Sequence, residues 1–390
     1  MNKKRKAMTG DQAAAEAMRQ IDPDVVPAYP ITPQTEIVMT FAQFVADGIV
    51  KTEMIPVESE HSAMSACVGA SAAGARVMTA TSANGLALMW EILYIASGLR
   101  LPIVMPLVNR ALSAPINIHC DHSDGMGARD SGWIQMYCET AQEVYESMFL
   151  AVKIAEDNDI LLPVMVCQDG FITSHATEAI DTIPDDEVKK YIGEYTPLYP
   201  LLDIKNPVTY GPLDLTDYYF EHKRQESEGM KKAYEKIPKI CADFSKFIGS
   251  WHGLVESYRM EDAERAILVL SSTAGTTKAV VDELREKGEK VGMIRPKFFR
   301  PFPAVEIAEA CKKIKTLAIL DRAEGFSNQG GPLFAETRAA LYTYGRILPV
   351  KNYIFGLGGR DITTVDIGKV YEDLKSPEKG DTVTYLGVRE

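Results

Sequence analysis

The sequence lacks the cysteine spacing, the long apolar runs and the basic excess that mark several common functional classes. Its six cysteines include no C-x-x-C pair, so the usual zinc-ribbon and iron–sulfur motifs are missing. The apolar run at 101–108 is interrupted by proline and is far shorter than the roughly 18 residues of a membrane span. Acidic residues outnumber basic ones by 54 to 42, which disfavours binding to a phosphate backbone. We therefore expect neither membrane insertion nor nucleic acid binding.

Motifs that present a nucleophile or a nucleotide are missing as well. The chain has no G-x-S-x-G elbow and no G-x-x-x-x-G-K-[ST] loop, which removes support for an α/β-hydrolase or a P-loop enzyme. The basic residues at 3–6 are not followed by the apolar core of a signal peptide. They predict a solvated tail on a cytoplasmic protein.

Most of the chain alternates short β-branched runs with stretches of helical period, which is typical of a mostly parallel sheet with helices on both faces. A Pro- and Tyr-rich excursion near 181–219 interrupts this pattern, and a charged helical run at 220–260 follows. We expect an α/β fold with a larger domain at 1–250 and a smaller one at 260–390. The predicted strands are at 25–28, 54–56, 77–81, 103–108, 162–166, 266–270, 291–294, 316–320 and 352–355. The predicted helices of the first domain are at 35–47, 61–74, 85–97 and 141–156.

Polar clusters follow four predicted strands, at the edge where open α/β sheets bind ligands. They lie at 29–36, 57–62, 79–85 and 109–133. Ordinary helix caps and tight turns also explain the first three. The fourth contains His119 and His122, which suit a metal-dependent hydrolase, although the spacing fits no complete metallohydrolase signature. We therefore expect no metal bound by this chain, and we keep the hydrolase as an alternative.

Taken together, these segments resemble the α subunit of the pyruvate:ferredoxin oxidoreductase family. The resemblance rests on Tyr-Pro-Ile-Thr-Pro from 29, Glu-Ser-Glu-His-Ser-Ala from 58, Thr-Ser-Ala-Asn-Gly from 81, Asn-Arg-Ala-Leu-Ser-Ala-Pro from 109, and Asp-Gly-Phe-Ile-Thr-Ser-His from 169. It implies a thiamine-diphosphate pyrimidine-binding domain followed by a smaller transketolase-C-terminal-like domain. The implied reaction converts pyruvate and coenzyme A to acetyl-CoA and carbon dioxide, with electrons passed to external ferredoxin. Another 2-oxoacid, 2-oxoisovalerate or 2-oxoglutarate, is the alternative substrate.

The resemblance also implies roles for particular residues. Glu60, with Glu58 as the weaker candidate, is the carboxylate that bonds the cofactor's pyrimidine N1′. Arg110 is expected to bind the substrate carboxylate and Thr32 to contact the substrate. The related oxalate oxidoreductases carry arginine in place of that threonine, so Thr32 argues for a monocarboxylate. Further cofactor contacts are expected at three positions: Pro30, Ser82 and Asn84.

Half of the expected machinery is not encoded in this chain. Thiamine enzymes hold Mg²⁺ through G-D-G and an asparagine about 30 residues on, a hard-oxygen site; the segment at 168–170 reads Gln-Asp-Gly. The resemblance therefore implies a β subunit that binds thiamine diphosphate with Mg²⁺, a γ subunit, and a ferredoxin-like δ subunit, with the [4Fe–4S] clusters on these partners. The chain should be inactive alone. A non-catalytic scaffold remains a further alternative. For the second domain we expect structural support, although its turn at 271–277 exposes backbone N–H groups that suit an anion.

Overall fold

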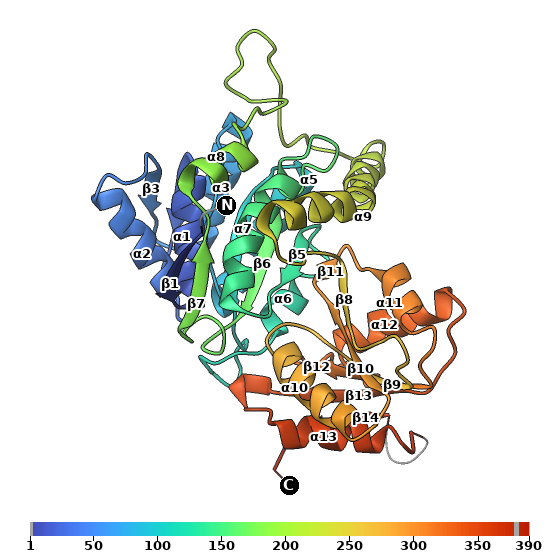
Figure 1. Cartoon of the computed structure of the whole chain (residues 1–390). Helices are drawn as coiled ribbons and strands as arrows, with labels where there is room; N and C mark the ends of the chain where they lie inside the picture. The colour runs from blue at the N-terminus through green and yellow to red at the C-terminus, as the bar shows by residue number, and fades with distance from the viewer. Residues whose placement is uncertain (1–2, 378–381, 390) are drawn as a thin grey trace.

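The computed structural model describes residues 3–377 and 382–389 and consists of two α/β units (Figure 1). The first contains a four-stranded sheet in the order β11-β5-β6-β4 and a parallel pair, β2-β3. Isolated bridges from residues 77, 78 and 81 connect β4 to β2. All of these pairings are parallel except that of β11 with β5. The strands are β2 (Val25–Ala28), β3 (Glu53–Pro56), β4 (Val104–Asn109), β5 (Ile134–Tyr137), β6 (Val164–Asp169) and β11 (Phe298–Arg300).

Helices cover both faces of this sheet because the strands are apolar on both sides. β4, β5 and β6 are buried at every position. One face packs against α1 (Gly10–Ile21), α2 (Thr35–Ala46), α7 (Ala141–Ala155) and α9 (Tyr219–Ile248). The other face packs against α3 (Glu60–Ala73), α4 (Ala83–Leu88) and α5 (Trp90–Gly98). A short helix, α6 (Ser123–Gly127), lies in the loop between β4 and β5.

The basic N-terminal segment is an edge strand, so the prediction of a solvated tail was wrong for its described residues. β1 (Lys4–Met8) pairs antiparallel with β7 (Glu178–Thr182), and α8 (Asp185–Ile192) follows. The backbone of β1 is paired while its first four side chains stay exposed. Charged side chains on an edge strand are compatible with pairing on one side only. Met1 and Asn2 lie outside the described residues.

The second unit is a six-stranded sheet in the order β14-β13-β12-β9-β10-β8, parallel except for β8. Its strands are β8 (Val255–Tyr258), β9 (Arg265–Val269), β10 (Val291–Pro296), β12 (Thr316–Asp321), β13 (Val350–Phe355) and β14 (Val383–Leu386). One face packs against α10 (Thr273–Glu286) and α13 (Thr364–Asp373). The other packs against α11 (Ala304–Ala310) and α12 (Pro332–Thr343), in a core shared with α3 and α5. The two units are therefore joined by a continuous apolar core.

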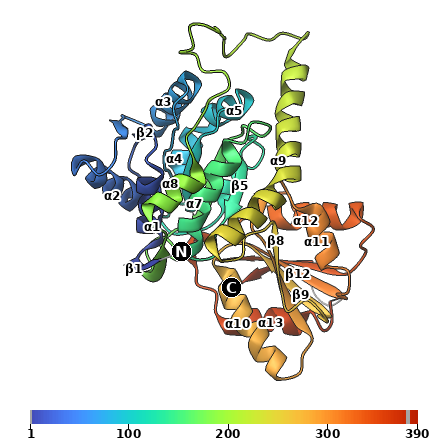
Figure 2. The same ribbon diagram turned by 45° about the horizontal axis from the view of Figure 1, so that its top comes forward.

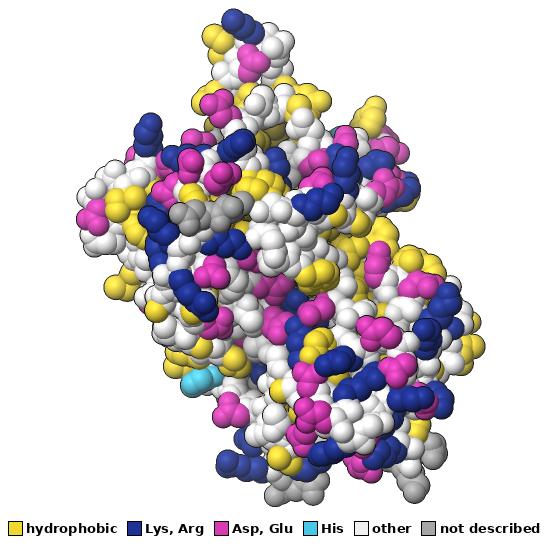
Figure 3. Space-filling view, in the orientation of Figure 1, with side chains coloured by type: hydrophobic (Ala, Val, Ile, Leu, Met, Phe, Trp, Pro, Cys, Tyr) yellow, Lys and Arg dark blue, Asp and Glu magenta, His cyan; other side chains and the backbone are white. Residues whose placement is uncertain are grey.

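Four predicted segments differ from the observed ones. The excursion near 181–219 contains α8, and the helical run at 220–260 ends at Ile248 and is followed by β8. The predicted strand at 77–81 forms only isolated bridges, and the predicted helix at 85–97 is divided into α4 and α5 at Met89. Between α8 and α9, residues 193–218 contain no helix or strand and project from the body (Figure 2). Acidic and basic side chains are interspersed over the face drawn in Figure 3. Within the described ranges, no helix is both long and apolar enough to cross a membrane.

Candidate active site

Glu60 is the first residue of α3 and its carboxylate is almost fully buried. The Ser59 hydroxyl caps the helix by accepting the Ser62 N–H at 3.2 Å, which turns the chain so that Glu60 faces inward. The whole residue is 6% exposed, and its side chain makes no hydrogen bond or ion pair within residues 3–377 and 382–389. Glu58, by contrast, is exposed and accepts a hydrogen bond from Ser62. A buried carboxylate without a partner is costly in a stable fold, so Glu60 is suited to a ligand that donates to it.

The turn before α4 packs directly against Glu60. A Cβ at Gly85 would lie 2.7 Å from Glu60 Oε1 and 2.5 Å from Thr81 Oγ1, so only glycine allows this approach. The hydroxyls of Thr81 and Ser82 are buried and have no hydrogen-bond partner in the described residues. Asn84 is exposed at the start of the same helix. The structure therefore gathers a carboxylate and two unpaired hydroxyls around Gly85.

Arg110 follows β4 and its guanidinium is fixed by two backbone carbonyls. Nε donates to the Asn117 carbonyl and Nη1 to the Thr32 carbonyl, both at 2.8 Å. Nη2 makes no hydrogen bond within the described residues. The side chain forms no ion pair with Asp121 or Asp124, although the whole residue is only 7% exposed. Part of the guanidinium thus remains available for an anionic ligand.

The turn that carries Thr32 is held in place by Gln34. The Gln34 side chain donates to the Ala80 carbonyl at 2.9 Å, and it accepts the Ile31 N–H at 3.1 Å. Pro30 and Thr32 themselves are exposed. Hydrogen bonds therefore connect the 29–36 cluster both to the 79–85 cluster and to Arg110.

Asp124 in α6 connects the 79–85 and 109–133 clusters. Its Oδ2 accepts the backbone N–H groups of Ala83 and Arg110, both at 3.0 Å, and its Oδ1 accepts from Asn109 Nδ2 at 2.9 Å. Burial raises its pKa to about 6, even though these donors favour the carboxylate. From sequence, Asp124 is a possible metal ligand or ion-pair partner of Arg110; its backbone contacts are not predicted, because its partners lie up to 41 residues away.

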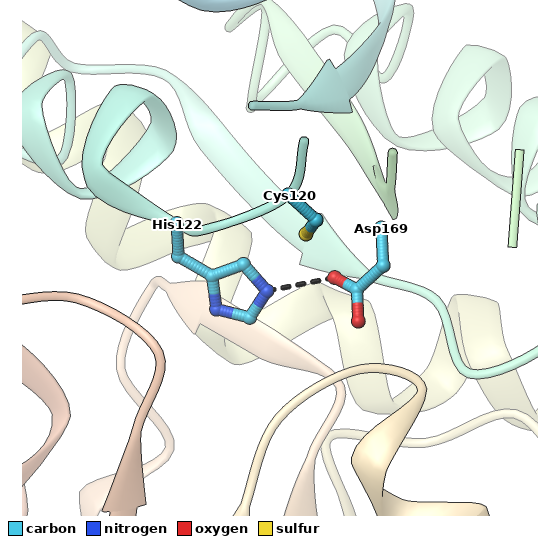
Figure 4. A group of neighbouring side chains, drawn as sticks. All are labelled: Cys120, His122 and Asp169. Atoms are coloured by element: carbon cyan, nitrogen blue, oxygen red, sulfur yellow. Dashed lines mark hydrogen bonds and ion pairs between the residues drawn. The ribbon is translucent and has the colours of Figure 1, made fainter. Parts of the chain in front are cut away.

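Behind this site, His122 belongs to a buried ion-pair network and not to a pair with His119. His122 Nε2 lies 2.7 Å from Asp169 Oδ1 (Figure 4). Burial opposes ionisation of Asp169, yet His122 and Arg322 hold its pKa below the ordinary value. Arg322 Nη1 also lies 3.5 Å from Cys120 Sγ. Because this guanidinium sits against two of the potential ligands, the group is unsuited to a metal ion.

His119 lies apart from this network, with its ring 5.0 Å from that of Phe171. It is not a member of either His/Cys/carboxylate group that the described residues bring within ligand distance. The two histidines of the hydrolase alternative therefore do not form a common metal site.

The comparison with known proteins decides the family. Residues 16–242 match the family described as pyruvate flavodoxin/ferredoxin oxidoreductase, thiamine diphosphate-binding, and residues 263–367 match pyruvate:ferredoxin oxidoreductase core domain II. The chain belongs to the pyruvate:ferredoxin oxidoreductase family. The predicted family, the enzyme class and the α/β fold class with mostly parallel sheets are thus confirmed.

Curated members of this family match over almost the whole chain. The chain is 58% identical over 387 residues to the pyruvate synthase subunit PorA of Thermotoga maritima, covering 99% of this chain and 98% of that one. It is 46% identical over 385 residues to the PorA of Methanothermobacter thermautotrophicus, covering 99% and 98%. It is also 43% identical over 376 residues to the ketoisovalerate oxidoreductase subunit VorA of Pyrococcus abyssi, covering 95% and 93%.

A solved structure shares the fold. The 2-oxoglutarate:ferredoxin oxidoreductase from Magnetococcus marinus, determined with 2-oxoglutarate, coenzyme A and succinyl-CoA bound, superposes with a TM-score of 0.75 at 21% identity. The match covers 95% of this chain and 65% of that one.

Proposed function

We propose that this chain is the α subunit of a heteromeric, thiamine-diphosphate-dependent oxidoreductase that converts pyruvate, coenzyme A and oxidised ferredoxin to acetyl-CoA, carbon dioxide and reduced ferredoxin. One observation carries the proposal: the buried, unpaired Glu60 faces a polar site on a chain that is 58% identical over its length to a pyruvate synthase subunit. We place the complex in the cytoplasm. The six free, buried cysteines support a reducing compartment.

The residues around Gly85 fit the pyrimidine half of thiamine diphosphate. A planar, nitrogen-rich ring offers partners to Glu60 and to the unpaired hydroxyl of Ser82, with Pro30 and Asn84 at the exposed rim. When bound, thiamine diphosphate supplies the carbon that adds to the keto group and the electron sink for loss of the carboxylate. Glu60 would hold a proton at the pyrimidine N1′, and its burial keeps water from competing for that hydrogen bond.

Arg110 and Thr32 would position the substrate. The two carbonyls that fix the Arg110 side chain pre-orient its free Nη2 for a carboxylate, and a planar guanidinium gives strong charge-assisted hydrogen bonds. Thr32 is exposed beside it and offers a neutral hydroxyl, which favours a substrate with one carboxylate.

Partner subunits would supply the remaining components. We assign Mg²⁺ and the diphosphate half of the cofactor to a β subunit, because Asp169 is engaged by His122 and Arg322. We assign the [4Fe–4S] clusters to a γ subunit and a ferredoxin-like δ subunit, with external ferredoxin as the acceptor. The absence of any C-x-x-C pair from the sequence supports this division.

The test is coenzyme A-dependent viologen reduction by the purified native complex. Pyruvate, 2-oxoisovalerate and 2-oxoglutarate are compared in parallel, because a VorA subunit is also similar to this chain. We expect the highest kcat/KM for pyruvate, and a higher value for another 2-oxoacid would overturn the substrate assignment. Glu60→Gln should abolish turnover while the complex still assembles. Full turnover in that variant would favour the scaffold alternative.

A further inference from the structure

Three further polar side chains converge next to the turn that carries Thr32. Asp11 lies in the first turn of α1, Glu36 in the first turn of α2, and His175 in the loop after β6. One ligand atom from each lies within 4.8 Å of the others, and His175 Nδ1 is 3.8 Å from Asp11 Oδ2. Sequence separations of 25 and 139 residues hide this group from any motif search.

In the described part of the chain, no lysine or arginine side chain neutralises the two carboxylates. Asp11 is completely buried, and its Oδ2 has no hydrogen-bond partner in the described residues. Neither Asp11 nor Glu36 forms an ion pair with lysine or arginine within residues 3–377 and 382–389. The buried Asp11 oxygen without a donor lies next to the half-buried Glu36 carboxylate, and a cation between them would stabilise both charges.

Each of the three groups is oriented by a neighbour, as metal ligands in proteins are. Gln168 Nε2 donates to Asp11 Oδ1 at 2.9 Å. Thr9 Oγ1 and Gln12 Nε2 donate to the two Glu36 oxygens at 3.0 and 2.9 Å. Ser174 Oγ lies 2.7 Å from His175 Nδ1. These contacts leave Asp11 Oδ2 without a donor in the described residues.

A cavity of 460 Å³ opens beside the group, with Glu36 and His175 in its wall. A bound ion would therefore have three protein ligands and an open side for water. Two carboxylates and one imidazole suit a divalent transition metal such as Zn²⁺, Mn²⁺ or Fe²⁺. Thr32 and Pro33 line the same cavity, so an ion here would also fix the start of α2 next to the proposed substrate contact.

We propose that Asp11, Glu36 and His175 bind one divalent transition-metal ion that ties α1 and α2 to the loop after β6. This site revises the expectation that the chain binds no metal. Its test is independent of the pyruvate assignment, because metal binding is measured without substrate and none of the three residues forms a hydrogen bond or ion pair with Glu60 or Arg110 in the described structure.

The test is calorimetric titration of the chelator-treated full chain with Zn²⁺, followed by the absorption spectrum of the Co²⁺ form. We expect one ion per chain. Asp11→Asn, Glu36→Gln and His175→Ala should each weaken binding at least about tenfold, since even outer-shell changes have effects of that size. Thermal melting with and without Zn²⁺ checks that each variant folds. If Asp11→Asn does not fold, the Zn²⁺ affinity of Glu36→Gln tests the proposal in its place.

Two matched controls separate this site from adventitious binding. His119→Ala removes a histidine that contacts the same Phe171 ring, at 5.0 Å against 4.7 Å for His175, and should leave Zn²⁺ affinity unchanged. Cys120→Ser alters the buried Cys120–His122–Asp169 group and should also leave it unchanged. No stoichiometric binding by the wild-type chain, or binding that survives Asp11→Asn and His175→Ala, would overturn the proposal.

Discussion

Replacing Arg110 with alanine distinguishes two possible roles of this residue, binding of the substrate carboxylate and support of the fold alone. If the free Nη2 binds the substrate carboxylate, the loss should be about 2–5 kcal/mol, the range for removal of one member of a buried charge pair. At 1.36 kcal/mol per factor of ten, kcat/KM for pyruvate falls by about 30-fold to 5,000-fold. Unfolding free energy should also fall, by about 1–3 kcal/mol, because the Asn117 and Thr32 carbonyls lose their donor. Lysine should rescue kcat/KM only in part, because an ammonium lacks the planar fork.

The assay is steady-state viologen reduction by the assembled complex, with thermal melting of the same samples. Arg100→Ala is the matched control, because Arg100 Nε also donates to backbone carbonyls, those of Ile160 and Leu161 at 3.2 Å, but outside the site. The control should lower the melting temperature and leave KM unchanged. If Arg110→Ala behaves in the same way, Arg110 is structural and the assignment of its role fails.

Two further predictions concern Gly85 and Asp321. Gly85→Ala should weaken thiamine diphosphate binding at least tenfold in a fluorescence titration of the complex, because the new Cβ would lie 2.7 Å from Glu60 Oε1. The control is Gly69→Ala, in the same helix as Glu60, where a Cβ would have no atom within 4 Å. This control should leave cofactor affinity unchanged and stabilise α3 by about 0.5–1 kcal/mol. Burial raises the pKa of Asp321 to about 7, so the folded state binds this proton more tightly than the unfolded one. The Asp321 contribution to stability is therefore present below pH 4 and is lost as the pH rises through 7, by on the order of 4 kcal/mol. Melting temperatures between pH 4 and 8 should show a shallower decline for Asp321→Asn than for the wild type, and equal slopes would contradict the reasoning.

Local sequence patterns predict most of the fold, and the elements that they do not predict have physical explanations. The buried strands β4, β6, β9 and β12 are continuous apolar runs, which read clearly from sequence. β1 has exposed, charged side chains, so no hydrophobic period marks it. α1 escaped prediction although Thr9 and Gln12 form a capping box, a signal that the sequence does contain.

Local motifs also indicated the site segments but not the contacts between them. Glu60, Arg110 and Thr32 stand out within their own clusters, and their roles remain predictions. Asp124 and Gln34 hold those clusters together through partners 41 and 46 residues away. Such contacts depend on strand order, which short-range pattern does not determine.

The second unit supports the site from behind, through the loop that carries Arg110. The Arg322 carbonyl accepts the His122 N–H at 2.7 Å, and Ser272, in the turn that suited an anion, bonds the Asp169 carboxylate. In the middle of the loop, Asn117 Nδ2 donates to the Gly358 carbonyl at 3.0 Å while the Asn117 carbonyl accepts from Arg110. The turn at 271–277, which was expected to suit an anion, thus binds the Asp169 carboxylate of the first unit. Because the Arg110 loop is bonded to the second unit at Asn117 and at His122, displacement of that unit would move the guanidinium.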